Sequence, residues 1–177
     1  MRVPAIAALC AALLGGVLTA QSNRVEPVGQ GGPIHYFRDT ATLTVDSVTL
    51  GFMPATAPLS DPRKSGKQFV RLAVTVTNTG KTVFPMNYTT LSLQTSDFTR
   101  HGTTSSINKG NRTDRLGSDK LQPGASVSGA LYYEISGKET RDALKLVYDG
   151  HAGSDDKDFL FPLTAAKGGE NYGTVSR

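Results

Sequence analysis

Cysteine and tryptophan are nearly absent from this chain of 177 residues: Cys10 is its one cysteine, and it has no tryptophan. A single cysteine cannot form a disulfide within the chain. Small exported domains often depend on disulfides, so an exported form of this chain must be held together by its hydrophobic core. At this length one domain buries enough surface for that.

Runs of basic residues are also missing. The chain has 19 Lys and Arg against 15 Asp and Glu, a formal net charge of +4. Nucleic-acid binding calls for a basic stripe or a run of five to eight Lys or Arg residues, and no such run occurs. We therefore expect no nucleic-acid partner.

A long apolar stretch occurs only at the start, in MRVPAIAALCAALLGGVLTA. One positive charge, an apolar core and small residues before Gln21 are typical of a secretory signal peptide, which predicts cleavage after Ala20. An uncleaved membrane anchor is disfavoured because it needs about 20 apolar residues. A lipid anchor on Cys10 is disfavoured because it needs a longer apolar run before the cysteine. The prediction is an exported protein, secreted or associated with the cell envelope, with no stable membrane span once the signal is removed.

Period-two alternation marks two extended segments. In VRLAVTVTNTGKTV the apolar residues Val70, Leu72, Val74 and Val76 alternate with Arg71, Ala73, Thr75 and Thr77, which predicts a half-buried strand. The stretch Asn78 to Lys81 then predicts a tight turn before a new extended piece. The second segment places Val127, Gly129, Leu131, Tyr133 and Ile135 on one face and Ser128, Ala130, Tyr132 and Glu134 on the solvent face.

Weaker alternation predicts further short strands around residues 91–93, 144–148 and 159–163. Near residue 45 the buried parity changes, which predicts a bulge at Asp46-Ser47. A 3.6-residue pattern is hard to find after the first twenty residues. The sequence therefore predicts an all-β, immunoglobulin-like antiparallel β-sandwich of about 6–8 strands without a disulfide.

Composition suggests four parts of the chain. Residues 1–20 are the predicted signal peptide, and residues 21–40, rich in glycine and containing Pro27 and Pro33, are predicted to be a flexible linker. The sandwich domain is expected over residues 41–164. Residues 165–177 are expected to be a polar tail.

Three segments carry a family resemblance: FVRLAVTVTNTGKTVF (residues 69–84), LQPGASVSGALYYEI (121–135) and LKLVYDG (144–150). Together they resemble a family of bacterial secreted immunoglobulin-like domains of unknown function, in the fold group of the mycobacterial immunoprotective extracellular antigen. The resemblance implies a sandwich and export. It implies no active-site residue, and the chain lacks the Cys pair and Trp of antibody domains.

Catalytic motifs are missing. No Gly-x-Ser-x-Gly elbow is present, and three histidines among many acids form Ser/His/Asp triples by chance. We therefore predict no enzyme, no catalytic residue and no cofactor.

An acidic group at Asp149, Asp155, Asp156 and Asp158 surrounds His151. It lacks calcium-loop spacing, and a solvated hairpin turn is the alternative that we prefer, so no metal site is predicted. A secreted metal or small-ligand carrier that uses His101, His151 and this turn remains the alternative function.

The segment from Asp97 to Lys120 is long and polar for a connection. It holds the candidate partner-binding residues Arg100, His101, Lys109, Arg112 and Arg115, and it has room for a short strand around residues 103–107. Loops on a rigid scaffold commonly carry binding residues, although a mobile solvated connection is the alternative. The predicted function is an exported, non-enzymatic binding module whose partner is an unknown protein or an envelope component.

Overall fold

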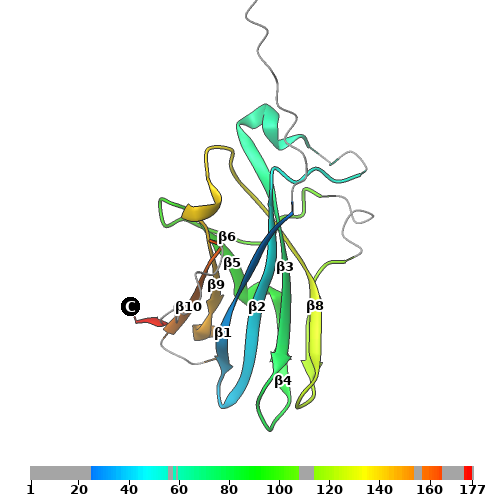
Figure 1. The fold of residues 1–177 in the computed structure, drawn as a ribbon, viewed down its shortest axis with the longest axis vertical. Helices are drawn as coiled ribbons and strands as arrows, with labels where there is room; N and C mark the ends of the chain where they lie inside the picture. The colour runs from blue at the N-terminus through cyan, green and yellow to red at the C-terminus, as the bar shows by residue number, and fades with distance from the viewer. Residues whose placement is uncertain are drawn as a thin grey trace, which may run out of the picture.

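The computed structural model describes residues 25–55, 58, 60–107, 114–153, 157–164 and 174–176. Two antiparallel sheets face each other (Figure 1). The first has the order β1 (Glu26–Tyr36), β2 (Asp39–Leu50), β3 (Lys67–Asn78) and β8 (Ser126–Ser136). The second has the order β11 (Thr174–Ser176), β10 (Lys157–Pro162), β9 (Lys145–Asp149), β5 (Leu91–Gln94) and β6 (Arg100–His101).

Shorter elements complete the domain. A two-stranded ribbon joins β4 (Phe84–Met86) to β7 (Asp119–Leu121), and the 3-10 turns are η1 (Pro62–Ser65), η2 (Tyr88–Thr90), η4 (Arg141–Ala143) and η5 (Gly150–Gly153). In the described part of the chain, β1, β2, β3, β5, β8, β9 and β10 are the strands with four or more residues. The predicted all-β sandwich is confirmed.

The core lies between the sheets and follows the period-two pattern. Val70, Leu72, Val74 and Val76 on β3 are completely buried, and Leu131 and Tyr133 on β8 lie beside them. The second sheet contributes side chains to the same cluster, among them Leu91, Leu93, Leu146, Tyr148 and Phe161. Burying one such side chain stabilises a fold by about 1.5–3 kcal/mol, so this shared interior replaces the missing disulfides.

Two local predictions are confirmed. The register between β2 and β3 shifts between Val45 and Ser47, which is the predicted bulge. After β3, the side chain of Asn78 is 1% exposed; its oxygen accepts from the Gly80 N–H at 2.8 Å, and its Nδ2 donates to the carbonyls of Thr82 at 2.7 Å and Leu121 at 2.8 Å. This asparagine therefore fixes the turn and ties it to the end of β7.

The prediction of a flexible linker over residues 21–40 is wrong for Glu26–Tyr36. These residues form β1, which pairs with β2 and buries Val28 and Ile34 in the core. A proline cannot donate to a ladder, but β1 is an edge strand, where this is tolerated. Gly29, with φ of 63°, lies in the register shift between Pro27 and Gln30. Glu26–Tyr36 therefore belongs to the sandwich.

The ends of the chain are described in part. Thr174–Ser176 pairs with β10 as β11, so this piece of the predicted polar tail belongs to a sheet. The predicted signal peptide, residues 1–20, lies outside the described residues. Within the described part of the chain, no helix has the length and apolar character that crossing a membrane requires.

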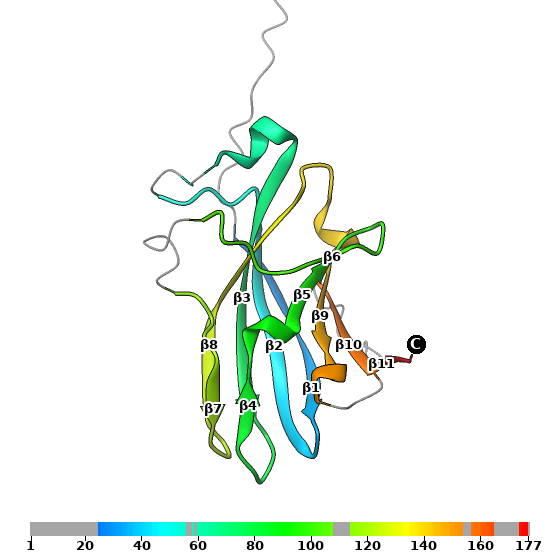
Figure 2. The ribbon, with the colours of Figure 1, turned by 180° about the vertical axis from the view of Figure 1, so that it is seen from behind.

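The connection from β6 to β7 differs from its prediction. Residues 103–107 form no strand; the strands lie at Arg100–His101 and Asp119–Leu121. Figure 2 shows this connection crossing the sheet surface beside β3 and β8. As a result Ala130 and Tyr132, predicted to face solvent, are buried in a second cluster with Phe69 and Ile107.

Candidate functional site

The β6–β7 connection is built onto the open edge of β8. The Leu116 N–H donates to the Ala130 carbonyl at 2.9 Å, and the Ala130 N–H donates to the Asp114 carbonyl at 2.7 Å. Gly129 allows this approach, because a Cβ there would lie 2.6 Å from the Leu116 Cα. An uncovered edge strand invites pairing with another chain, and here the connection covers it. The alternative of a mobile solvated connection is therefore wrong for its described parts.

Asp114 anchors the connection to the outer face of the sheet. Its carboxylate accepts hydrogen bonds from Arg71 Nη2 and, at 2.5 Å, from the Tyr132 hydroxyl. Burial works to raise the pKa of Asp114, but the hydrogen bonds from Arg71 and Tyr132 lower it overall. Burial, together with the hydrogen bond to Asp114, raises the pKa of Tyr132. The ionised form of Asp114 thus holds the connection in place.

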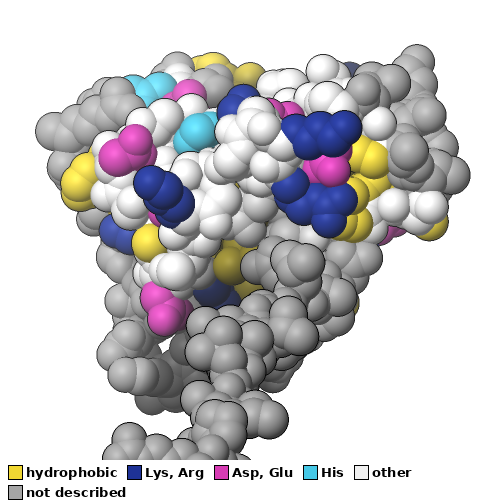
Figure 3. Space-filling model, turned by 90° about the horizontal axis from the view of Figure 1, so that it is seen from above, with side chains coloured by type: hydrophobic (Ala, Val, Ile, Leu, Met, Phe, Trp, Pro, Cys, Tyr) yellow, Lys and Arg dark blue, Asp and Glu magenta, His cyan; other side chains and the backbone are white. Residues whose placement is uncertain are grey.

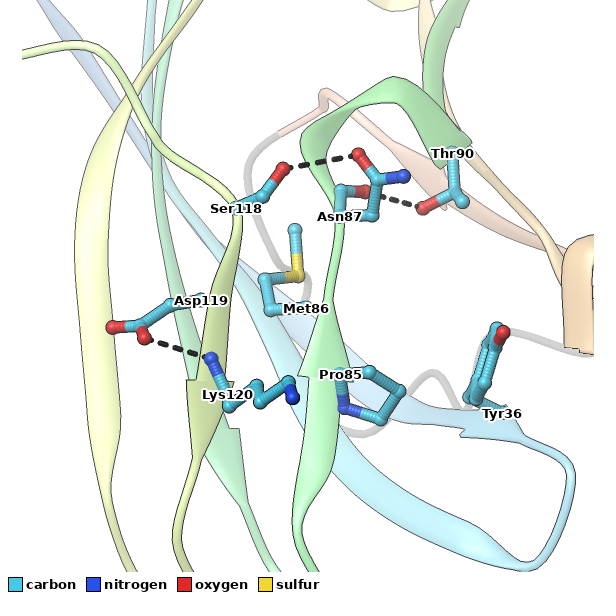
Figure 4. Close-up of a pocket in the computed structure, with 8 residues that line it drawn as sticks. All are labelled: Tyr36, Pro85, Met86, Asn87, Thr90, Ser118, Asp119 and Lys120. Atoms are coloured by element: carbon cyan, nitrogen blue, oxygen red, sulfur yellow. Dashed lines mark hydrogen bonds between the residues drawn. The ribbon is translucent and has the colours of Figure 1, made fainter.

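The end of the connection lines a cleft of about 640 Å³ (Figure 4). Three separate segments meet there: the end of β1, residues 85–90, and residues 118–120. The apolar lining comes mainly from Tyr36 and Pro85, which face each other across the hollow, because Met86 is 2% exposed and packs into the core. Binding pockets commonly have volumes of about 300–1,000 Å³ and apolar linings with a few placed polar groups.

The polar side of the cleft is organised by Asn87. Its Oδ1 accepts from the Thr89 N–H at 3.0 Å, which caps η2, and from Ser118 Oγ at 3.1 Å. Thr90 Oγ1 donates to the Asn87 carbonyl at 2.7 Å. Asp119 and Lys120, both exposed, complete this side. The cleft therefore offers hydrogen-bonding groups of both kinds around an apolar floor.

An exposed aromatic side chain stands next to the cleft. Phe37 is 57% exposed, and its ring packs edge-on against Tyr36 with the centroids 4.8 Å apart. Its φ of 55° is unusual for a large side chain, which pays about 1–2 kcal/mol in this region. Such an outlier suggests a role outside folding, because Gly or Asn would suit the turn better.

A second hollow of about 740 Å³ lies around η1, lined among others by Met53, Asp61 and Lys64. It borders the stretch in which residues 56, 57 and 59 lie outside the description. The face at this end of the molecule carries Lys and Arg side chains next to acidic ones (Figure 3). Some of these charges are paired, as in Arg63 with Asp61, whose side chains are 2.9 Å apart.

The structure describes three of the five predicted partner-binding residues, and it places them in two different parts of the connection. Arg100 and His101 lie in β6, where Arg100 Nη2 is 2.5 Å from Asp158 Oδ2 and His101 Nε2 is 3.3 Å from Thr95 Oγ1. Arg115 packs over the Tyr88 ring at 4.3 Å and donates to Thr103 Oγ1 at 3.2 Å. Lys109 and Arg112 lie outside the described residues.

Sequence reasoning found one part of the cleft and missed another. Asp119 and Lys120 belong to the segment predicted to bind, whereas Tyr36 was assigned to a linker and Pro85 and Met86 to the scaffold. The adjacent aromatics Tyr36 and Phe37, directly before the polar pair Arg38-Asp39, were the one available sign of a hairpin that carries aromatic side chains. None of the three histidines lines the cleft.

The fold defines this chain as an immunoglobulin-like β-sandwich domain. The family profile described as "Domain of unknown function (DUF4352)" matches residues 38–158, and the chain belongs to that family. The predicted resemblance to a family of such domains is thereby confirmed. No catalytic activity is part of the family's description. Comparison with curated proteins gives no match.

The chain is similar to several solved structures at low sequence identity. The yjhA protein from Bacillus subtilis is 18% identical, with a TM-score of 0.58 over 77% of this chain and 97% of that one. A putative lipoprotein from Bacillus subtilis, ycdA, is 15% identical, with a TM-score of 0.51 over 85% of this chain and 38% of that one. The secreted protein MPT63 from Mycobacterium tuberculosis is 10% identical, with a TM-score of 0.49 over 70% of this chain and 86% of that one.

Proposed function

We propose that this protein is an exported, non-enzymatic recognition module, and that its cleft holds an apolar side chain of a protein partner or an envelope component. The carrying observation is the cleft itself, in which Tyr36 and Pro85 form an apolar floor beside Asn87, Ser118 and Lys120. A partner side chain would fill the floor. The polar groups would bind the partner's main chain next to it.

The construction of the cleft supports recognition rather than chemistry. Its walls are held by the hydrogen bonds of Asn87 and by the docked connection, so the cleft is preformed and little ordering is required on binding. A catalytic serine or threonine needs a histidine base beside its hydroxyl. Among the described residues, the histidine that contacts a hydroxyl is His101, whose Nε2 is 3.3 Å from Thr95 Oγ1. Thr95 is buried, and its hydroxyl donates to Asp97 at 2.7 Å. A buried hydroxyl engaged in this way does not serve as a nucleophile.

Export is part of the proposal. The first twenty residues have the layout of a signal peptide, and the ycdA relative is described as a putative lipoprotein. Both fit a place outside the cytoplasm, either secreted or at the cell envelope. Arg115, which packs over the Tyr88 ring, belongs to the proposed recognition surface. Lys109 and Arg112 lie in the same connection and stay predicted partner-binding residues.

The test fills the cleft without touching the core. Thr90→Trp places a large side chain in the hollow, and Lys64→Trp is the matched control in the second hollow. Labelled protein is incubated with washed cell-envelope material, and the retained fraction is measured by sedimentation, with circular dichroism as the check on folding. We expect retention to fall at least tenfold for Thr90→Trp and to stay at the wild-type level for Lys64→Trp.

Two results would reject the cleft. One is wild-type retention by a correctly folded Thr90→Trp protein. The other is an equal loss in both variants, which would point to the added tryptophan itself.

A further inference from the structure

The end of the β9–β10 hairpin brings two carboxylates face to face. Asp149 and Asp158 are direct partners in the antiparallel register, and the Asp158 side chain is 4% exposed. Like charges directly opposite each other destabilise a strand pair, and burial of one of them increases the cost. The sequence-based preference for a solvated turn is therefore wrong at Asp158. Asp155 and Asp156 lie outside the described residues.

A histidine nitrogen points at both carboxylates. His151 Nδ1 is 3.2 Å from Asp149 Oδ1 and 3.4 Å from Asp158 Oδ1, and one ligand atom from each of the three residues lies within 4.8 Å of the others. Zinc binds nitrogen and carboxylate oxygen at about 2.0–2.2 Å in a tetrahedron, whose edges are then roughly 3.3–3.6 Å. The two separations from Nδ1 lie within about 0.1 Å of that range, and the 3.2 Å one also fits a hydrogen bond between His151 and Asp149 in the metal-free protein.

The remaining atoms of these residues hold the ligand atoms in position. The backbone N–H of His151 donates to Asp149 Oδ1 at 3.0 Å, and Arg100 Nη2 contacts the other oxygen of Asp158 at 2.5 Å. Ligating carboxylates in metal sites are typically oriented by such outer contacts. Arg100 also offsets one of the two negative charges, so Arg100, Asp149 and Asp158 together carry one negative charge in excess.

We propose that Asp149, His151 and Asp158 form a zinc site and supply three of its four ligands. A nitrogen and two carboxylate oxygens suit zinc better than calcium, which takes six to eight oxygens. The bound cation balances the excess charge and joins the ends of β9, η5 and β10. None of the three zinc-binding residues lines the cleft, so the zinc site is tested independently of the proposed recognition function.

The test is a zinc titration of the chelator-treated, dialysed protein at pH 7.5, followed by calorimetry and by the thermal midpoint. We expect one zinc per chain and, at a hundredfold excess over Kd, a rise in Tm of about 5–10 °C, because a ligand that prefers the folded state stabilises it. His151→Ala and Asp149→Asn should weaken zinc binding at least tenfold. His101→Gln is the matched control, since His101 contacts Thr95 and is not in the cluster.

Three results would overturn the assignment. The first is the absence of both a binding heat and a Tm shift in the wild-type protein. The second is wild-type affinity in His151→Ala and Asp149→Asn, or an equal loss in His101→Gln, which would indicate scattered surface binding. The third is calcium binding as tightly as zinc, which would indicate an acidic site that does not use the imidazole.

Discussion

Replacing Gly129 by alanine tests whether close backbone contact keeps the β6–β7 connection on the edge of β8. The added Cβ would lie 2.6 Å from the Leu116 Cα and 2.7 Å from its nitrogen. Carbon atoms in contact are normally about 3.5–4.0 Å apart, so the connection must move by roughly 1 Å. That shift would stretch the two hydrogen bonds between this segment and Ala130, now 2.9 and 2.7 Å long.

The size of the effect follows from these contacts. Overpacking costs about 1–3 kcal/mol, and each weakened hydrogen bond about 1 kcal/mol. Alanine regains about 0.5–1 kcal/mol over glycine in a strand through chain entropy. We therefore expect Gly129→Ala to lower the free energy of unfolding by about 2–4.5 kcal/mol and the Tm by roughly 5–15 °C.

Urea denaturation measures the free energy of unfolding, and amide hydrogen exchange reports on the connection directly. The amides of Thr104 and Leu116, which donate to β8, should lose protection in Gly129→Ala while those of β9 keep it. Gly117→Ala is the matched control, because a Cβ there has no atom within 4 Å. It should change stability by less than about 1 kcal/mol.

The steric argument fails if Gly129→Ala is as stable as the control variant, or if the Leu116 amide keeps its protection. Either result would mean that the connection accommodates a methyl group without leaving β8.

Three further variants address other parts of the structure. Phe37→Asn should raise the free energy of unfolding by about 0.5–1 kcal/mol, because asparagine tolerates positive φ. Retention of this variant on envelope material should fall. A lower stability of the variant in urea denaturation would contradict this prediction. Asp114→Asn should destabilise the protein by about 1 kcal/mol at pH 7. The pKa of Asp114 in the folded protein lies below its ordinary value of 3.8, so the stabilisation by its carboxylate is present above pH 3.8 and is lost as the pH falls through the lowered pKa. Denaturation at pH 7 and at strongly acidic pH should therefore show the stability difference between wild type and Asp114→Asn shrinking. A difference that stays constant would contradict the ionic role. Asn78→Ala should cost about 2–4 kcal/mol, since it removes the side-chain donor of the Thr82 and Leu121 carbonyls and one of the two acceptors of the Gly80 N–H. A loss below about 1 kcal/mol by thermal denaturation would refute that account.

Predictions from sequence succeeded where neighbouring residues carry the signal. The alternation at Val70 to Val76 fixes which face of β3 is buried, because successive side chains of a strand point to opposite sides. The change of parity after Val45 likewise predicted the bulge. Local alternation missed β1, because its glycines and prolines suggest a linker, and only pairing with β2 shows that an edge strand accepts them.

The candidate site was less predictable for the same reason. Lys120 was expected on a binding segment, but Tyr36 and Pro85 join it only when β1, β4 and β7 come together. Arg100 was expected to face a partner, yet it reaches Asp158, 58 residues further along the chain. Tyr132 has the parity of a solvent-facing residue and is covered by the connection above it.

The amino-acid sequence by itself determined the all-β class, the buried faces of the main strands, the turn at Asn78 and the absence of a disulfide. These properties depend on local periodicity, on backbone preferences of single residues and on the cysteine count. The tertiary structure alone decided the cleft, the covered edge of β8 and the meeting of Asp149, His151 and Asp158. Each of these depends on how the chain between the strands is laid over the sheets, and no short-range pattern encodes the distance between segments that are far apart in the sequence.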